Sequence, residues 1–119
     1  MTITPSERYH AAILTLQGEF VGATDGPAFR EALDKLRATG KKNVVVDLGA
    51  VTFMDSSGLG ALIAAATALR AEGGDLKLAA METSPRLTWM ANVFRLHDVF
   101  SIHPTADAAA ESFAPQAAG

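Results

Sequence analysis

The sequence contains no cysteine. A disulfide-stabilised scaffold and a zinc site built from thiolates are therefore excluded, and the composition fits a reducing compartment. Basic residues are also few, with 10 Lys and Arg against 13 Asp and Glu and a net charge of −3. Lys41-Lys42 is the only doubled basic pair, so no electrostatic surface of the kind that binds nucleic acid is visible. We therefore expect no nucleic-acid partner.

Long hydrophobic runs are missing as well. The most apolar stretch, from Leu59 to Leu69, is much shorter than the roughly 20 residues that a membrane-spanning helix needs. The segment MTITPSERYH at the start has neither the basic nor the apolar region of a signal peptide. The sequence therefore predicts no membrane span and a cytoplasmic location.

Length and composition favour one globular domain. The 119 residues are 49% hydrophobic and 19% charged, which is ordinary for a chain that buries about two thirds of its unfolded surface in a single core. The last segment, APQAAG, has few side chains to bury. We expect a domain over residues 1–113 and a loose tail over residues 114–119.

The N-terminal part predicts two strands. A short strand is expected around Thr2 to Thr4, and a second through HAAILTLQGEF, where side chains of different polarity alternate until Gly18 ends the strand. An amphipathic helix should follow, with Thr24 or Asp25 as its N-cap and Gly40 as its end.

The middle of the chain gives the clearest pattern. The β-branched run NVVVDL, from Asn43, predicts a strand that is covered on both faces, paired in parallel and placed at the centre of the sheet. A helix from Leu59 should follow and end at Gly73-Gly74, with Leu62, Ile63 and Ala66 on its buried face.

The C-terminal part continues the alternation of strands and helices. DLKLAAM predicts a strand, Ser84-Pro85 the start of a helix, DVFSIH a short strand, and Pro104 to Phe113 a last helix. This order predicts an α/β domain with a mostly parallel mixed sheet of four to five strands and about four helices. The side chains expected in its core include Val45, Leu62, Ile63, Leu78 and Trp89.

The usual catalytic motifs are absent. Met54 occupies the position of the first glycine in a G-x-S-x-G nucleophile motif around Ser56. Gly58-Leu59-Gly60 lacks the third glycine of a dinucleotide loop, because Ile63 stands there. The histidines share no metal-ligand spacing. We therefore expect neither an enzyme nor a metal site, and a hydrolase that uses Ser56 or Ser57 lacks a histidine placed as its base.

One junction is chemically richer than a simple connection requires. Between the central strand and the following helix lies Asp55-Ser56-Ser57-Gly58-Leu59-Gly60. A helix N-terminus presents unpaired N–H groups and a positive dipole, so a phosphoryl group on Ser56 would be electrostatically favoured. The alternative is structural: Asp55, Ser56 or Ser57 caps the helix, and the glycines let it pack close to the sheet.

These residues resemble the STAS family, the anti-sigma factor antagonists of bacterial partner-switching systems. The stretch VVVDLGAVTFMDSSGLGALIAAATALRAEGGDLKLAA looks like the core of that family, with its motif D-S-[ST]-G-[LIV]-[GA] between strand and helix. The resemblance extends over nearly the whole chain, with TLQGEF similar to the second strand of the family and Ser84-Pro85 similar to the start of its third helix.

The resemblance implies a switch rather than an enzyme. It implies that Ser56 is phosphorylated by a serine-kinase anti-sigma factor, which binds the ATP and magnesium, and that a separate phosphatase resets the phosphoserine. Unphosphorylated, the chain would bind the kinase and so release a sigma factor; it would need no cofactor of its own. Asp55, Ser57, Gly58 and Leu59 are expected on the partner-facing surface, and small residues there would let the kinase approach Ser56. For Leu59, a place in the core is the alternative.

Two positions depart from the family pattern. Val21 stands where the family commonly has aspartate, and Asp25 is the candidate substitute. Arg95 stands where a glycine usually precedes Leu96, so the local turn is expected to differ. The missing aspartate keeps a second function open, that of an accessory or scaffold STAS domain which binds a transport ATPase or a stress-signalling assembly without a regulated phosphoserine.

Overall fold

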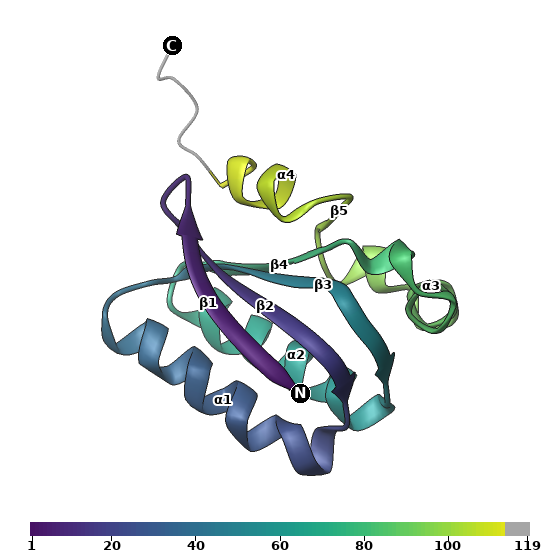
Figure 1. Cartoon of the computed structure of the whole chain (residues 1–119). Helices are drawn as coiled ribbons and strands as arrows, with labels where there is room; N and C mark the ends of the chain where they lie inside the picture. Colours follow the sequence, from purple (N-terminus) through teal and green to yellow (C-terminus); the bar gives the residue numbers. More distant parts are fainter. Residues whose placement is uncertain (114–119) are drawn as a thin grey trace.

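The computed structural model describes residues 1–113, in which helices flank a five-stranded sheet (Figure 1). The loose tail expected over residues 114–119 lies outside the described residues. The strands and helices, in chain order, are β1 Thr2–Arg8, β2 Ala11–Phe20, α1 Gly22–Ala38, β3 Asn43–Met54, α2 Ser56–Ala71, β4 Asp75–Ala79, α3 Pro85–Val93, β5 Ile102–His103 and α4 Ala106–Glu111. Two short 3-10 turns lie at Met81–Thr83 and Leu96–Asp98.

The sheet has the order β1-β2-β3-β4-β5. Only β1 is antiparallel to its neighbour, and the other three pairings are parallel. Strand β3 is central, as the β-branched run beginning at Asn43 predicts. Crossover connections between neighbouring parallel strands are almost always right-handed, so α1, α2 and α3 all lie on the same face of the sheet. The predicted α/β fold with a mostly parallel sheet is confirmed.

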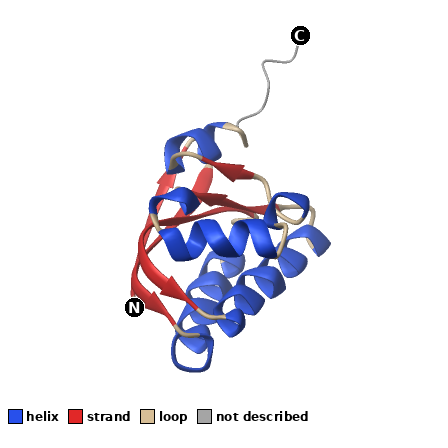
Figure 2. Ribbon diagram, turned by 90° about the vertical axis from the view of Figure 1, so that its right-hand side faces the viewer, coloured by secondary structure: helices blue, strands red, loops and turns tan. Residues whose placement is uncertain are grey.

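Each face of the sheet has its own apolar cluster. The larger cluster packs α1, α2 and α3 against inward side chains such as Leu14 and Val46. On the opposite face, Ala109 and Ala110 of α4 cover a small cluster that includes Val45. In the side view of Figure 2, α4 lies apart from the other helices, beyond the strands. Two covered faces explain why β3 is apolar at successive positions.

The core prediction is correct for three residues and wrong for two. Val45, Leu62 and Leu78 are completely buried, whereas Ile63 is 38% exposed and Trp89 is 49% exposed. Each exposed residue directly adjoins a buried one, Leu62 or Met90. Neighbouring residues on a helix point about 100° apart, so the buried face of each helix includes Leu62 or Met90 but not the adjacent Ile63 or Trp89.

Two predicted boundaries are also wrong. Strand β2 continues through Gly18 to Phe20, because Gly18 adopts φ +97 at an irregularity in the register with β3 and does not end the strand. Helix α1 starts at Gly22 with Val21 as its N-cap, earlier than a cap at Thr24 or Asp25 would allow.

Other glycine stops and turns are close to expectation. Gly40 and Gly73 have positive φ just after α1 and α2, and both predicted helix ends are confirmed. Arg95 also adopts φ +51, so the left-handed turn persists with arginine in place of glycine and the expected change of turn is wrong. Strand β1 is longer than predicted, and the strand expected in DVFSIH is limited to Ile102–His103.

Within the described part of the chain, no helix is both long enough and apolar enough to cross a membrane.

Candidate functional site

The junction between β3 and α2 is built around Asp55. This residue is the N-cap of α2, in extended conformation, and its Oδ1 accepts a hydrogen bond from the Gly58 backbone N–H at 2.7 Å. Ser56 and Ser57 are the first residues of the helix, and both are exposed. Because Asp55 is the cap, neither serine hydroxyl is needed to start the helix.

Asp55 also connects this junction to the start of α1. Its Oδ1 accepts a second hydrogen bond, from the Gly22 backbone N–H at 3.0 Å, and its own backbone N–H donates to the Phe20 carbonyl at 3.3 Å. One carboxylate oxygen thus binds N–H groups from the first turns of two helices. The arrangement fixes the end of β2, the end of β3 and both helix starts relative to one another.

Electrostatics keep this carboxylate ionised. The Gly22 and Gly58 N–H groups lower the pKa of Asp55 below its ordinary value, desolvation opposes them, and the positive charge of Arg86 adds to the lowering. A carboxylate that is stabilised in this way is a poor proton donor. Its geometry suits a structural anchor better than an acid–base catalyst.

Two glycines are required by close packing, and a third is not. A Cβ on Gly58 would lie 2.7 Å from the Phe20 carbonyl oxygen, and a Cβ on Gly22 would lie 2.3 Å from the Ser57 carbonyl carbon. Around Gly60 the same test finds open space. Close packing against the end of β2 therefore explains Gly58, as the structural alternative proposed. Packing does not require Gly60, which lies on the outer side of α2.

Two of the residues expected on a partner-facing surface lie below it. Leu59 is 4% exposed and belongs to the larger core cluster, and Gly58 is buried. The expectation that Leu59 presents its side chain to a partner is therefore wrong, because Leu59 lies one turn before Leu62 on the inward face of α2. Ser56 and Ser57 are exposed, and Asp55 is partly exposed.

Asp25, the candidate substitute for a missing aspartate at position 21, has a local role. Its Oδ2 accepts a hydrogen bond from the Val21 backbone N–H at 2.8 Å. The carboxylate thus binds the backbone N–H of the N-cap residue and stabilises the first turn of α1. This contact was not predicted, because the sequence analysis gave Thr24 or Asp25, and not Val21, as the N-cap of α1.

Arg86, from the first turn of α3, is a neighbour of the junction that sequence reasoning missed. Its Nε donates to the Met54 carbonyl at 3.2 Å. Its guanidinium lies over the Phe53 ring at 4.9 Å and over the Trp89 ring at 5.1 Å from the centroids. Trp89 in turn packs edge-on against Phe94, at 6.4 Å between ring centroids. No sequence signal links Arg86 to Met54, because 32 positions separate them.

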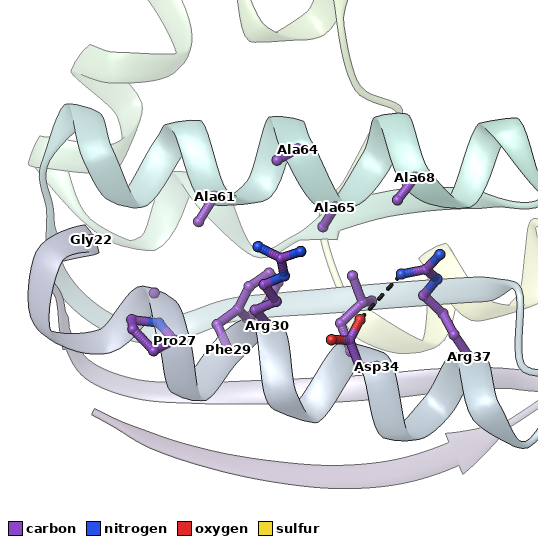
Figure 3. Close-up of a pocket in the computed structure, with 12 residues that line it drawn as sticks. Gly22, Pro27, Phe29, Arg30, Asp34, Arg37, Ala61, Ala64, Ala65 and Ala68 are labelled. Atoms are coloured by element: carbon purple, nitrogen blue, oxygen red, sulfur yellow. Dashed lines mark hydrogen bonds and ion pairs between the residues drawn. The ribbon is translucent and has the colours of Figure 1, made fainter.

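A groove of about 520 Å³ runs between α1 and α2 (Figure 3). Alanines line its α2 side, and side chains of α1, among them Phe29 and Arg30, line the other. Arg37 at its far end pairs with Asp34 at 3.1 Å. Ser56 and Ser57, which are both exposed, do not line this groove.

The described residues offer little support for other chemistry at this junction. Within residues 1–113, no group of three or more His, Asp and Glu side chains could hold a metal ion. His103 hydrogen-bonds Ser101 at 2.9 Å, and no histidine in the same range hydrogen-bonds Ser56 or Ser57.

Comparisons with known proteins agree on one family. The STAS domain model matches residues 2–109. An anti-sigma factor antagonist from Mycobacterium paratuberculosis is 25% identical with a TM-score of 0.78, over 93% of this chain and 92% of that one. A candidate antagonist from Thermotoga maritima is 18% identical with a TM-score of 0.82, over 92% of both chains.

A third similar protein is the anti-sigma factor antagonist SpoIIAA, solved both unphosphorylated and, from Bacillus, phosphorylated. The unphosphorylated form is 19% identical with a TM-score of 0.71, over 93% of this chain and 96% of that one. At this identity, and at that of the Thermotoga maritima protein, the likeness shows the fold alone.

Proposed function

The chain belongs to the STAS domain family, and we propose that it acts in a bacterial cytoplasm as an anti-sigma factor antagonist whose partner binding is switched by phosphorylation of Ser56. The observation that carries the proposal is the exposed Ser56 side chain at the first position of α2, directly after an aspartate that already caps the helix. A hydroxyl in that place is free to be modified without loss of the fold. The functional domain comprises residues 1–113.

Ser56 is a better acceptor than Ser57 for a geometric reason. The Ser57 Cβ and carbonyl carbon lie against Gly22 so closely that a Cβ added to Gly22 would meet them at 2.4 and 2.3 Å. The start of α1 therefore flanks Ser57. Within residues 1–113 neither serine hydroxyl makes a hydrogen bond, so the close packing at Gly22 is what distinguishes Ser57 from Ser56. A kinase has more room to align a phosphate with Ser56.

The switch acts through charge at a contact surface. The partner is a serine-kinase anti-sigma factor that brings ATP and magnesium, and this chain brings the hydroxyl. A phosphate adds about −1.5 to −2 charges. A close contact that acquires such a group loses several kcal/mol of binding free energy unless a cation pairs with the phosphate, and each 1.4 kcal/mol is a tenfold change in affinity. The unphosphorylated chain would bind the kinase and release a sigma factor, and a phosphatase would restore that state.

The burial of the neighbouring residues refines their roles. Ser57 and the exposed part of Asp55 can touch a partner directly. Gly58 and Leu59 would contribute indirectly, because their packing against the body of the domain fixes the position and direction of the first turn of α2. The partner would therefore meet small residues around Ser56, among them Ser57 and Gly60.

Two measurements test the proposal. Mass mapping after treatment with the kinase, ATP and magnesium should place the phosphate on Ser56 alone. Calorimetric titration with the kinase should show tight binding for Ser56→Ala and weak binding for Ser56→Asp, while Ser57→Ala, the matched control, keeps both phosphorylation and binding.

Phosphate on Ser57, or equal affinities for Ser56→Ala and Ser56→Asp, would overturn the assignment of Ser56. A partner that binds the Ser56→Ala and Ser56→Asp proteins equally and is not a kinase would support the accessory or scaffold function instead.

A further inference from the structure

We infer that Arg86 is the counter-ion of the phosphate on Ser56 and binds it from its position beside Phe53 and Trp89. This inference rests on the proposed function and names a regulatory part of the same site. It gives a role to the two Nη groups of Arg86, which make no hydrogen bond within residues 1–113.

Arg86 lies close to the chain segment that carries Ser56. Arg86 Nε is bonded to the Met54 carbonyl at 3.2 Å, and Ser56 follows Met54 by two residues, so their Cα atoms are at most about 7.6 Å apart. The charge of Arg86 also lowers the pKa of Asp55, the residue between them. A phosphate on Ser56 would therefore come within reach of the guanidinium after side-chain rotation.

Arg86 has hydrogen-bonding capacity that the described residues do not use. Within residues 1–113 Arg86 makes one hydrogen bond, through Nε, and no ion pair. Both Nη groups are available as donors. A guanidinium can bind phosphate through two parallel N–H groups, a geometry that lysine cannot match.

The Arg86 side chain is already held in place in the unphosphorylated chain. Phe53 and Trp89 hold the guanidinium at 4.9 and 5.1 Å from their ring centroids. An arginine that is already ordered loses less conformational freedom when it binds an anion than one that is free in solution. The Asp55 carboxylate directly precedes Ser56 and would repel a phosphate there, so a cation beside the phosphate offsets this repulsion.

The consequence is a reversal of surface charge. In the unphosphorylated chain, Arg86 offers a positive charge beside the exposed rings of Trp89 and Phe94. Once Ser56 carries its phosphate, that charge is paired and the same surface is net negative. A partner that matches the unphosphorylated surface with a carboxylate loses its counter-charge in the same step.

The test does not need the kinase. Phosphoserine is installed at position 56 during translation, and the second ionisation of its phosphate is followed by phosphorus NMR in the otherwise wild-type chain and in Arg86→Gln, Arg86→Lys and Arg30→Gln. Arg30 is the matched control, because it lies in the groove between α1 and α2 and forms no ion pair within residues 1–113.

We expect the phosphate pKa to rise by roughly one unit in Arg86→Gln, by less in Arg86→Lys, and to stay unchanged in Arg30→Gln. Trp89 is the only tryptophan, so its fluorescence should also change on phosphorylation only when Arg86 is present. Equal phosphate pKa values in Arg86→Gln and its parent, or equal shifts in Arg86→Gln and Arg30→Gln, would overturn the inference.

If Arg86→Gln does not fold, an Arg86→Lys value equal to the parent value overturns the bidentate pairing. If the kinase does not phosphorylate Ser56, the proposed function is refuted, but the titration still shows whether Arg86 pairs with a phosphate there. Failure of the proposed function and failure of this inference are therefore distinguishable.

Discussion

Helix α2 buries every leucine that it carries, whereas α3 leaves its tryptophan half exposed. Leu59, Leu62 and Leu69 are all at most 4% exposed, and the outer surface of α2 carries mainly small residues. On α3, Leu87 and Met90 are buried, but Trp89 is 49% exposed and Val93 53%. Both helices bury one apolar face, but the outward side of α3 carries the larger and more exposed apolar side chains, while α2 exposes only Ile63 among its large ones.

The difference follows from what each helix packs against. Helix α2 contacts α1, β3 and β4, so a broad face is covered and apolar residues on it are buried. Helix α3 has nine residues and contacts mainly the end of β3 and the two short turns around it, so no further layer of helix or strand covers its outward side chains. The buried apolar residues of α2 thus stabilise the fold, while Trp89 and Val93 on the outward side of α3 are exposed near Arg86, and exposed apolar side chains of this kind are often used for binding.

The sharpest test of the comparison within α2 is Leu62→Ala. Leu62 is completely buried, so the substitution should lower the free energy of unfolding by about 2–5 kcal/mol. Ile63→Ala is the matched control and should lower it by much less, because Ile63 is 38% exposed. Urea unfolding of both variants gives the comparison, and equal losses would show that the two faces of α2 are assigned wrongly.

Gly58→Ala and Gly60→Ala should change stability in opposite directions. A Cβ at position 58 would lie 2.7 Å from a backbone oxygen, and such overpacking costs about 1–3 kcal/mol. At position 60 there is open space, so alanine should stabilise the helix by about 1 kcal/mol. Thermal unfolding measures both, and two changes of the same sign would contradict the close approach of α2 to Phe20.

The Asp55 anchor should give a pH-dependent contribution of smaller size. The folded-state pKa of Asp55 is lowered, so its stabilising effect is fully present above the unfolded value near 3.8 and is lost as the pH falls through the folded value. Asp55→Asn should therefore destabilise the protein at pH 7 and differ progressively less from wild type below about pH 4.

Asp98→Asn serves as the control for that experiment, because Asp98 makes an exposed ion pair with Arg95, and such pairs contribute little. Denaturant unfolding at a series of pH values decides the point. A wild-type to Asp55→Asn difference that stays constant down to pH 2 would mean that the carboxylate charge does not support the junction.

The smallest effect on stability is expected for Trp89→Ala, at less than about 1 kcal/mol, against about 2–5 kcal/mol for the buried Met90→Ala. Partner affinity should respond in the reverse order. Calorimetry of unfolding together with titration of the partner measures both quantities. If Trp89→Ala loses as much stability as Met90→Ala, the exposed surface of α3 belongs to the fold and not to binding.

The sequence alone determined the order of the elements, the parallel sheet and the position of its central strand. These are local properties: the β-branched run at Asn43, the helical spacing of Leu59 and Leu62, and the glycines after α1 and α2 act on their own neighbours. The motif from Asp55 to Gly60 was also visible, and through it the family. Which of its side chains caps the helix was not, because each candidate oxygen suits that position equally well.

Only the tertiary structure decided what surrounds Ser56. Gly22 binds Asp55 from 33 positions away, and Arg86 reaches Met54 from 32 positions away. It also decided that Leu59 is core while Ile63 and Trp89 are surface. Periodicity marks a helix as amphipathic, but the direction of its buried face depends on the helices and strands that pack against it, and those contacts join residues that local sequence cannot connect.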